Sequence, residues 1–275
     1  MQLYPLVIIT TLALACAKKY PVASGYPPAA NESYTLAAKV ASAVPCKRTR
    51  MLRGKKAQHA VNLAVARTGS GSLTQAVRAM GFRAHHDHAC TLRDAARVGY
   101  DRVIMSLRDP AARVVSGFQR RVAGGLNKQA NRDFSDAFGD DPDGYVEALR
   151  DNSSPRHAAA LRVSLAPNAQ HWLMPVAEFY LSGFEERQNG SITVAFVCTA
   201  TLDAGVRAVA ARWGLGRRVL SRHASPKPSN ATMLSPINAA YVRALYARDV
   251  SLHKAHCGGE SAASFATYGR VAVVN

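Results

Sequence analysis

The chain has 275 residues, 48% of them hydrophobic and 19% charged, so it can build a sizeable core and is not a globally disordered protein. The net charge is +17, and Arg dominates the basic residues, with 26 Arg against 9 Lys. Because the planar guanidinium suits sulfate, phosphate and carboxylate oxygens, this balance predicts an anionic ligand or partner. A solvated basic surface is the alternative.

The N-terminus begins with an apolar run over residues 6–17, which a pair of lysines ends. A helix that spans a bilayer needs roughly 20 apolar residues, so this shorter run fits a signal peptide better. We expect residues 1–18 to be a signal peptide or a short signal-anchor, with a buried terminal strand as the alternative. Residues 19–58, which are interrupted by prolines, are expected to form a stem or linker, and residues 59–275 the folded domain.

Glycosylation sequons and cysteines also favour the secretory pathway. Sequons begin at Asn31, Asn152, Asn189 and Asn230. Outside the leader the cysteines are Cys46, Cys90, Cys198 and Cys257. These cysteines permit two disulfides in an oxidising lumen, in any of three pairings. Cys198 lies in an apolar run and has a second interpretation as a buried thiol. No CxxC spacing supports a zinc cluster.

Strand and helix patterns alternate along the rest of the chain. Strands are expected at residues 60–66, 82–88, 102–107 and 191–198. Helices are expected at residues 73–80, 90–98, 110–123, 202–213 and 236–247. The polar segment 127–155 is expected to be a long loop with at most one short helix. This alternation predicts an α/β fold of three layers, with a central parallel sheet and helices on both faces.

The first strand is followed by a turn rich in Gly and Ser, Arg67-Thr68-Gly69-Ser70-Gly71-Ser72-Leu73, and then by a helix. This arrangement is typical of a P-loop-like phosphate-binding loop, because glycines admit an anion to backbone N–H groups and the helix N-terminus adds positive potential. The loop lacks the Gly-Lys-Ser/Thr ending of nucleotidases. An ordinary connection between a strand and a helix is the alternative.

The third strand leads into a second motif, Leu107-Arg108-Asp109-Pro110-Ala111-Ala112-Arg113-Val114-Val115-Ser116-Gly117. Arg108 ends the strand, at the sheet edge where open α/β sheets bind ligands. Ser116 lies about two turns into the following helix, from where it can face the same edge. In the alternative interpretation, Asp109 and Arg113 only cap the helix and no ligand is involved.

Together these two motifs resemble those of the PAPS-dependent sulfotransferases. The first is similar to the family's 5′-phosphosulfate loop, which usually has Lys at the position of Arg67, and the second to its 3′-phosphate motif, Arg-Asp-Pro-x-x-Arg-x-x-Ser. Further segments resemble the Golgi carbohydrate branch of the family: His171-Trp172, Ser225-Pro226-Lys227, Leu234-Ser235, and a Tyr-x-x-Asp within Tyr241 to Asp249. The resemblance extends over residues 60–256.

The resemblance implies a site for the sulfate donor PAPS and no metal. Arg108 and Ser116 would bind the 3′-phosphate, and the segment from Thr68 to Leu73 would bind the 5′-phosphosulfate. Arg67 would be catalytic as well as cofactor-binding, because a cation stabilises charge that develops on the leaving phosphate oxygen. Ser225 and Lys227 would also contact the donor.

The acceptor hydroxyl must lose its proton, and a His or Glu near the sulfate can accept it. The cluster His85-His86-Asp87-His88 follows the expected second strand, where alternation places His86 and His88 on one face. We expect these two histidines to act as the base, with a structural role or a metal site as alternatives. Further candidate bases are Glu178, Glu185 and Glu186. His171 is expected to pack or to contact substrate.

The sequence therefore predicts a sulfotransferase that moves a sulfuryl group from PAPS to a hydroxyl, most simply one of a glycan, in the Golgi lumen as a type II membrane protein or after secretion. A secreted basic protein that binds polyanions, with a degenerate cofactor site, is one alternative. A nucleotide-dependent phosphotransferase is another, although it lacks the Lys-Ser/Thr and the carboxylate for Mg²⁺. Nucleic-acid binding is not expected, since no basic face rich in aromatic residues is present.

Overall fold

The computed structural model describes residues 60–63, 65, 67–80, 83–84, 90–123, 129–165, 173, 175–214, 233–259 and 261–271. The expected leader and stem lie outside these residues. The strands are β1 (Ala60–Leu63), β2 (Arg83–Ala84), β3 (Arg102–Leu107), β4 (Phe184–Glu186), β5 (Ile192–Cys198) and β6 (Ala263–Arg270). The α-helices are α4 (Ser70–Ala79), α5 (Leu92–Val98), α6 (Pro110–Ala123), α7 (Gln129–Phe138), α8 (Pro142–Arg150), α9 (His157–Leu165), α11 (Leu202–Arg212), α12 (Pro236–Leu245) and α13 (Ala247–Cys257). A π-helix, η1 (Val176–Tyr180), and a short 3₁₀ turn, η2 (Thr199–Thr201), complete the elements.

The strands form one six-stranded sheet in the order β2-β1-β3-β5-β6-β4. β2, β1, β3 and β5 are parallel, with Val61 beside Val103 and Val103 beside Val194. β6 pairs antiparallel with both β5 and β4. The α/β prediction is therefore confirmed, but the sheet is mixed and not purely parallel. β6 escaped prediction because its small and polar residues, Ala-Ser-Phe-Ala-Thr-Tyr-Gly-Arg, show no run of large apolar side chains.

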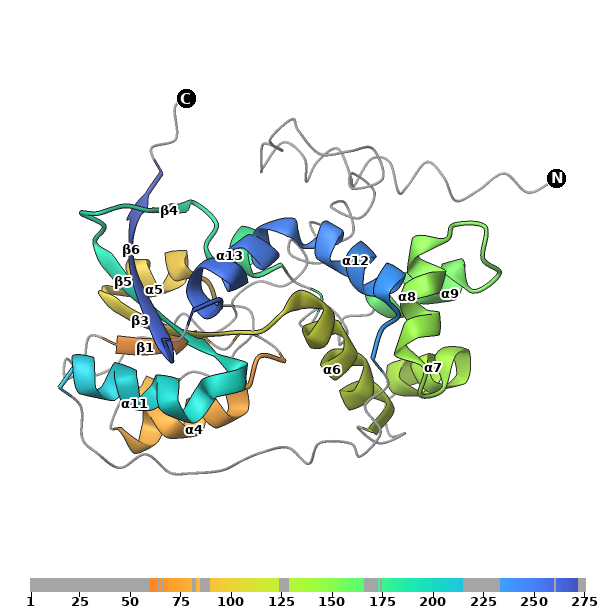
Figure 1. The fold of residues 1–275 in the computed structure, drawn as a ribbon, viewed down its shortest axis with the longest axis horizontal. Coiled ribbons are helices and arrows are strands. Elements are labelled where there is room, and N and C mark those ends of the chain that lie inside the picture. Colours follow the sequence, from red (N-terminus) through yellow and green to blue (C-terminus); the bar gives the residue numbers. More distant parts are fainter. Residues whose placement is uncertain are drawn as a thin grey trace.

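Helices cover both faces of the sheet. α4 and α11 pack against one face through residues such as Leu73, Val77 and Val206, and they lie side by side below the sheet in Figure 1. α5 and η1 pack against the other face, where Leu92 and Phe179 join the sheet residues in a second apolar cluster. β1, β3 and β5 are buried almost throughout, because α4 and α11 pack against them from one side and α5 and η1 from the other.

A separate group of helices, α7, α8 and α9, packs against α6 and α12 at one side of the sheet (Figure 1). The loop predicted over residues 127–155 is therefore wrong. Its acidic cluster is a helix cap: Asp141 accepts hydrogen bonds from the N–H groups of Asp143 and Gly144 at 3.1 and 2.9 Å, and Pro142 occupies the first helical position. Tyr145, Val146 and Ala148 then form the buried face of α8.

Capping residues explain why several element bounds could be read from the sequence. Asp109 accepts from the N–H of Ala112 at 3.0 Å and so starts α6, and Ser235 caps α12 by accepting from the N–H of Asn238 at 3.4 Å. The structure differs at α13, which continues the chain after a break at Tyr246 and was not expected as a separate helix. The first strand also ends earlier than predicted, and only part of the predicted second strand lies within the described residues.

Cysteines cross-link the domain. Cys198 at the end of β5 forms a disulfide with Cys257 at the end of α13, so the alternative of a buried free thiol at Cys198 is wrong. Cys90 is disulfide-bonded too. In the part of the chain that the structure describes, no helix has the length and apolar character to cross a membrane. The sequon residues Asn152 and Asn189 are exposed.

Candidate functional site

The candidate site lies where β1 and β3 end and α4 and α6 begin. Because the two strands are parallel neighbours, their carboxyl ends meet at one edge of the sheet. The loop after β1 and the Arg-Asp-Pro motif after β3 are therefore brought together, as hydrogen bonds between Arg67, Arg108 and Ser116 show. Arg67 and Ser116 are 49 residues apart in the sequence, and the fold brings them into direct contact.

The loop turns sharply before α4. Arg67 and Gly69 both have positive φ angles, 63° and 80°. α4 starts at Ser70, three residues earlier than expected, with its first helical hydrogen bond from the N–H of Leu73 to the carbonyl of Gly69. The N-cap residue of this helix is Gly69, which has no side chain to cap it. The first turn therefore presents backbone N–H groups with the geometry that suits an anion.

Thr68 fixes the loop to β3 through hydrogen bonds of its side chain. Its buried hydroxyl donates to the carbonyl of Val65 at 2.8 Å and accepts from the hydroxyl of Ser106 at 2.7 Å, since a hydroxyl carries one hydrogen. From the other side, the Thr199 hydroxyl is shared between the carbonyls of Thr68 and Leu107, at 2.8 Å each. The Thr68 hydroxyl is thus occupied within the fold, and the Leu73 side chain lies in the core, so both residues can offer a ligand only their backbone.

Two half-buried guanidinium groups, those of Arg67 and Arg108, lie beside the loop. The Arg67 Nε donates to the Ser116 carbonyl at 3.1 Å and its Nη2 to the Ser116 hydroxyl at 2.9 Å, while an Nη1 of Arg108 donates to the Arg67 carbonyl at 3.4 Å. Burial, then the positive charges of Arg108 and Arg120, lower the pKa of Arg67 to about 10. Burial also lowers the pKa of Arg108, against the opposing effect of Asp109. Both remain cations at neutral pH.

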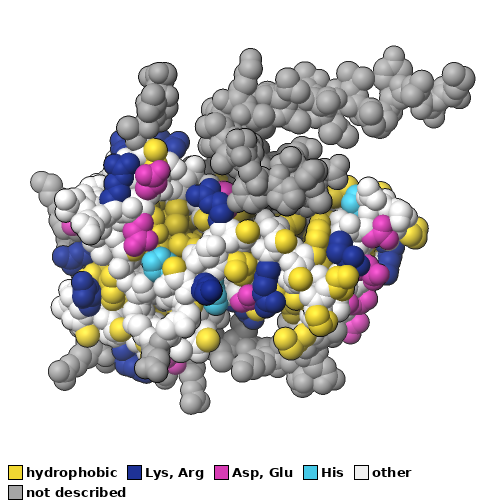
Figure 2. Space-filling model, turned by 45° about the horizontal axis from the view of Figure 1, so that its top comes forward, with side chains coloured by type: hydrophobic (Ala, Val, Ile, Leu, Met, Phe, Trp, Pro, Cys, Tyr) yellow, Lys and Arg dark blue, Asp and Glu magenta, His cyan; other side chains and the backbone are white. Residues whose placement is uncertain are grey.

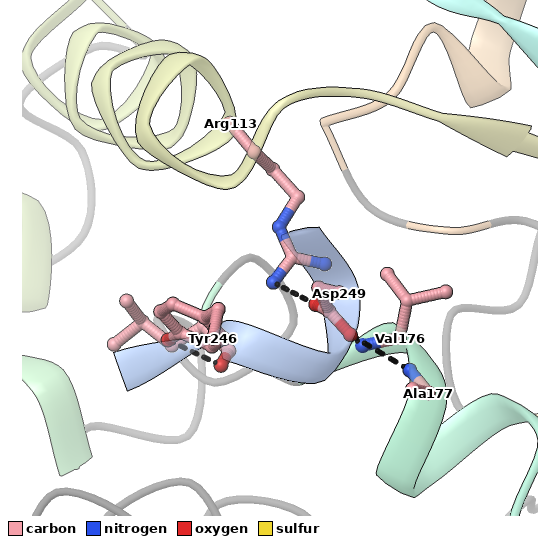
Figure 3. A network of polar contacts seen from close by, with 6 residues as sticks. Arg113, Val176, Ala177, Tyr246 and Asp249 are labelled. Atoms are coloured by element: carbon pink, nitrogen blue, oxygen red, sulfur yellow. Dashed lines mark hydrogen bonds and ion pairs between the residues drawn. The ribbon is translucent and has the colours of Figure 1, made fainter. Parts of the chain in front are cut away.

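The other arginine of the same motif has a structural role. Arg113 is 1% exposed and donates from Nη2 to a carboxylate oxygen of Asp249 at 3.2 Å, as Figure 3 shows. Asp249 also accepts from the N–H groups of Val176 and Ala177, at 2.8 Å each, and the Arg113 guanidinium lies 5.3 Å from the Tyr246 ring. The Arg-Asp-Pro segment and the Tyr-x-x-Asp segment therefore meet in one buried contact, which joins α6, α13 and η1.

The candidate bases are only partly described. His86 and His88, with His85, Asp87 and His171, lie outside the described residues, as do the expected donor contacts Ser225 and Lys227. Glu185 and Glu186 are exposed on β4, the edge strand three places beyond β3 in the sheet.

Glu178 lies in η1, with its carboxylate 3.5 Å from Nε of Arg248. Burial and the negative charge of Asp249 raise the pKa of Glu178 to about 7, which leaves it partly protonated at neutral pH. Among the described residues, no cluster of His, Cys, Asp and Glu is arranged to bind a metal.

Sequence reasoning missed three residues near the site. Ser106 and Thr199 fix the loop, and neither belongs to a recognisable motif. His253 is half-buried on α13, where burial lowers its pKa and the nearby charge of Asp109 opposes that effect. Its one sequence signal is its position one turn after Asp249, because residues four apart share a helix face.

Comparisons with known proteins add nothing to this geometry: no protein-family model, no curated protein and no solved structure matches the chain.

Proposed function

We propose that the chain is a PAPS-dependent sulfotransferase that transfers a sulfuryl group to a hydroxyl of a carbohydrate acceptor. One observation carries the proposal: within the described residues, the half-buried cations Arg67 and Arg108 hydrogen-bond only to neutral groups, Ser116 and the Arg67 carbonyl. Cations that lose water usually gain a counter-charge. An anionic ligand supplies that charge, beside the start of α4.

The two motifs favour a donor with two anionic groups over a single phosphate. The segment from Thr68 to Leu73 offers backbone N–H groups at a helix N-terminus, and Arg108 with Ser116 offers a guanidinium and a hydroxyl a short distance away. PAPS carries its 5′-phosphosulfate and its 3′-phosphate on one nucleotide, which fits this pair of subsites. In this proposal the domain is a three-layer α/β sulfotransferase fold, and the loop before α4 is its P-loop-like element.

In the proposed reaction the sulfuryl group passes directly from donor to acceptor, and the protein forms no covalent bond to it. The acceptor oxygen forms a bond to sulfur as the bond from sulfur to the 5′-phosphate oxygen breaks, and the acceptor proton passes to a base, for which His86 and His88 are proposed. N–H groups at the start of α4 stabilise the charge that grows on the leaving phosphate. No metal is needed for these steps.

Features away from the site support a luminal location. The expected leader, the exposed sequon residues Asn152 and Asn189, and the disulfide between Cys198 and Cys257 all suit an oxidising compartment. A Golgi enzyme with an N-terminal anchor, or a secreted enzyme, is therefore proposed. Carbohydrate is the acceptor class that the sequence resemblance implies.

Ligand-dependent stability tests the proposal directly. The desulfated product PAP, added at about 100 times its Kd, should stabilise the purified protein by about 2.7 kcal/mol and raise its melting temperature by several degrees. ATP, which has no 3′-phosphate, should give a smaller shift. A shift with ATP and none with PAP would replace this proposal by a phosphotransferase. A transfer assay with labelled PAPS and a panel of desulfated glycans then identifies the acceptor.

A protein that only binds polyanions is the second candidate function, and the net charge of +17 favours it. Figure 2 shows Lys and Arg side chains scattered over one face of the molecule, with acidic side chains among them. Such a surface binds acidic polysaccharide without a donor site. Arg108→Ala separates the two functions: it should abolish sulfuryl transfer if the first is right, while retention of the protein on heparin survives in either case.

A further inference from the structure

The Arg67 side chain points to α6. Two of its nitrogens, Nε and Nη2, are bound to the carbonyl and the hydroxyl of Ser116, at 3.1 and 2.9 Å. The positive φ of 63° at Arg67 is a conformation that a residue with a Cβ adopts rarely, at a cost of about 1 kcal/mol or more. The fold therefore holds the guanidinium beside Ser116, which is the residue expected to bind the 3′-phosphate.

Other positive groups converge on the same place. Arg108 donates to the carbonyl of Arg67 at 3.4 Å. Arg120 lies one helical turn after Ser116 on α6, and it is close enough for its charge to act on Arg67. Within the described residues, neither Arg67 nor Arg108 forms an ion pair with a carboxylate. The Ser116 hydroxyl thus accepts from Arg67, on which the charges of Arg108 and Arg120 act. Each guanidinium carries five N–H donors, so hydrogen-bond capacity remains for a ligand.

We propose that Arg67, together with Arg108 and Ser116, binds the 3′-phosphate of the donor, so that Arg67 selects nucleotides with a 3′-phosphate and does not stabilise the leaving oxygen. This inference rests on the proposed function. It also gives a reason for Arg where the resembling family has Lys. A planar guanidinium can hold Ser116 along one edge and a phosphate along another, whereas an ammonium is a point charge without such a fork.

The assignment leaves the leaving phosphate to the start of α4. Backbone N–H groups in its first turn, next to the N-cap residue Gly69, are preorganised donors for a developing charge. Loss of Arg67 should then weaken recognition of the 3′-phosphate and leave the chemical step nearly intact. If Arg67 sat at the leaving oxygen, its loss would instead reduce turnover of every donor alike.

The test compares binding of PAP and 5′-AMP, which differ only in the 3′-phosphate, by titration calorimetry on the full-length protein. Wild type should bind PAP at least 10-fold more tightly than AMP. Arg67→Gln should weaken PAP binding 10- to 100-fold and change AMP binding less than 3-fold, so that the preference for PAP collapses. Arg67→Lys keeps the charge and should retain only part of the preference, because it lacks the fork. The matched control is Arg78→Gln, which removes an exposed Arg from α4 and should change neither affinity.

Four outcomes count against the inference. Equal losses for PAP and AMP in Arg67→Gln would place Arg67 at the 5′ side, and an undiminished preference for PAP would remove it from the site. Either result leaves the proposed function standing if wild type still binds PAP. A wild type that binds neither nucleotide overturns the function and this inference together. If Arg67→Gln does not fold, the comparison of Arg67→Lys with wild type decides, since a full PAP preference in Arg67→Lys contradicts the need for a guanidinium.

Discussion

At the scale of single residues, the pair of Arg113 and Asp249 decides how the helical group is joined to the sheet. Both side chains are buried, 1% and 4% exposed, and Nε of Arg113 has no partner in the described part of the chain. Taking two charges out of water is costly. The cost is offset by the ion pair itself, by two backbone N–H groups on Asp249 and by the Tyr246 ring. The contact is therefore a structural anchor, and its charges are not available to a ligand.

Removing one partner of this pair should be far more damaging than removing one partner of an exposed pair. Arg113→Met leaves the Asp249 carboxylate buried without a counter-charge, which costs about 3–5 kcal/mol. The matched control is Arg187→Met, because Arg187 pairs with Glu185 at 3.3 Å with both side chains about half exposed. Such surface pairs contribute about 0–1 kcal/mol. Urea denaturation of both variants measures the difference, and similar losses would show that the buried pair is not an anchor.

At the scale of elements, two glycines lie at the start of α4, and only one of them has a backbone conformation that favours glycine. Gly69 has a φ of 80°, and a Cβ there would lie 3.3 Å from Cδ2 of Leu202. Gly71 has an ordinary φ, and a Cβ there would meet nothing within 4 Å. Gly69 is thus required by the backbone of the turn, whereas Gly71 is required, if at all, by what approaches the loop from outside.

This difference predicts opposite effects of the same substitution. Gly69→Ala should destabilise the domain by about 1–2 kcal/mol, because the left-handed backbone is strained by a side chain. Gly71→Ala should leave stability unchanged or raise it by about 0.5 kcal/mol, because Ala favours the helix. Thermal unfolding without ligand measures both. A loss of stability in Gly71→Ala as large as in Gly69→Ala would contradict the conformation of the turn.

Helices and strands with a capping residue or a clear hydrophobic pattern could be predicted from the sequence. Those that depend on contacts with distant parts of the chain could not. β3 and β5 are continuous apolar runs, and α6 has Asp109 and Pro110 at its start, so their bounds could be read locally. α8 was missed because its cap, Asp141, stands in a polar segment that reads as a loop until Tyr145 is buried by other helices. β6 was missed because its pairing with β5 depends on the fold.

The candidate site, too, has features that could be predicted from the sequence and features that could not. The loop and the Arg-Asp-Pro motif were visible, because glycines and a strand end have local signatures. The partnership of Arg67 with Ser116 was not, since it joins residues 49 apart, and neither were the shared hydroxyl of Thr199 and its carbonyl partners Thr68 and Leu107. The contact of Arg113 with Asp249 also required the structure, because it joins residues 136 apart in the chain.

At the scale of the whole molecule, the net charge of +17 exceeds what the one proposed donor site can use. Basic side chains are spread over the face in Figure 2 and do not form one patch there. A dispersed positive field attracts a long acidic chain without fixing its register, whereas the loop and Arg108 act on one group at a time. Binding of polyanions and binding of the sulfate donor should therefore be separable properties of this protein.

Salt dependence tests that separation. Retention on a heparin column should weaken steeply as ionic strength rises, because screening acts on many exposed charges together. Arg108→Ala should elute close to wild type, since it removes one of 35 basic residues from a half-buried position. The same variant should lose PAP-dependent stabilisation, because Arg108 lies at the site and not on the open surface. If Arg108→Ala eluted far earlier than wild type, capture of polyanions would depend on the donor site, and the two properties would be one.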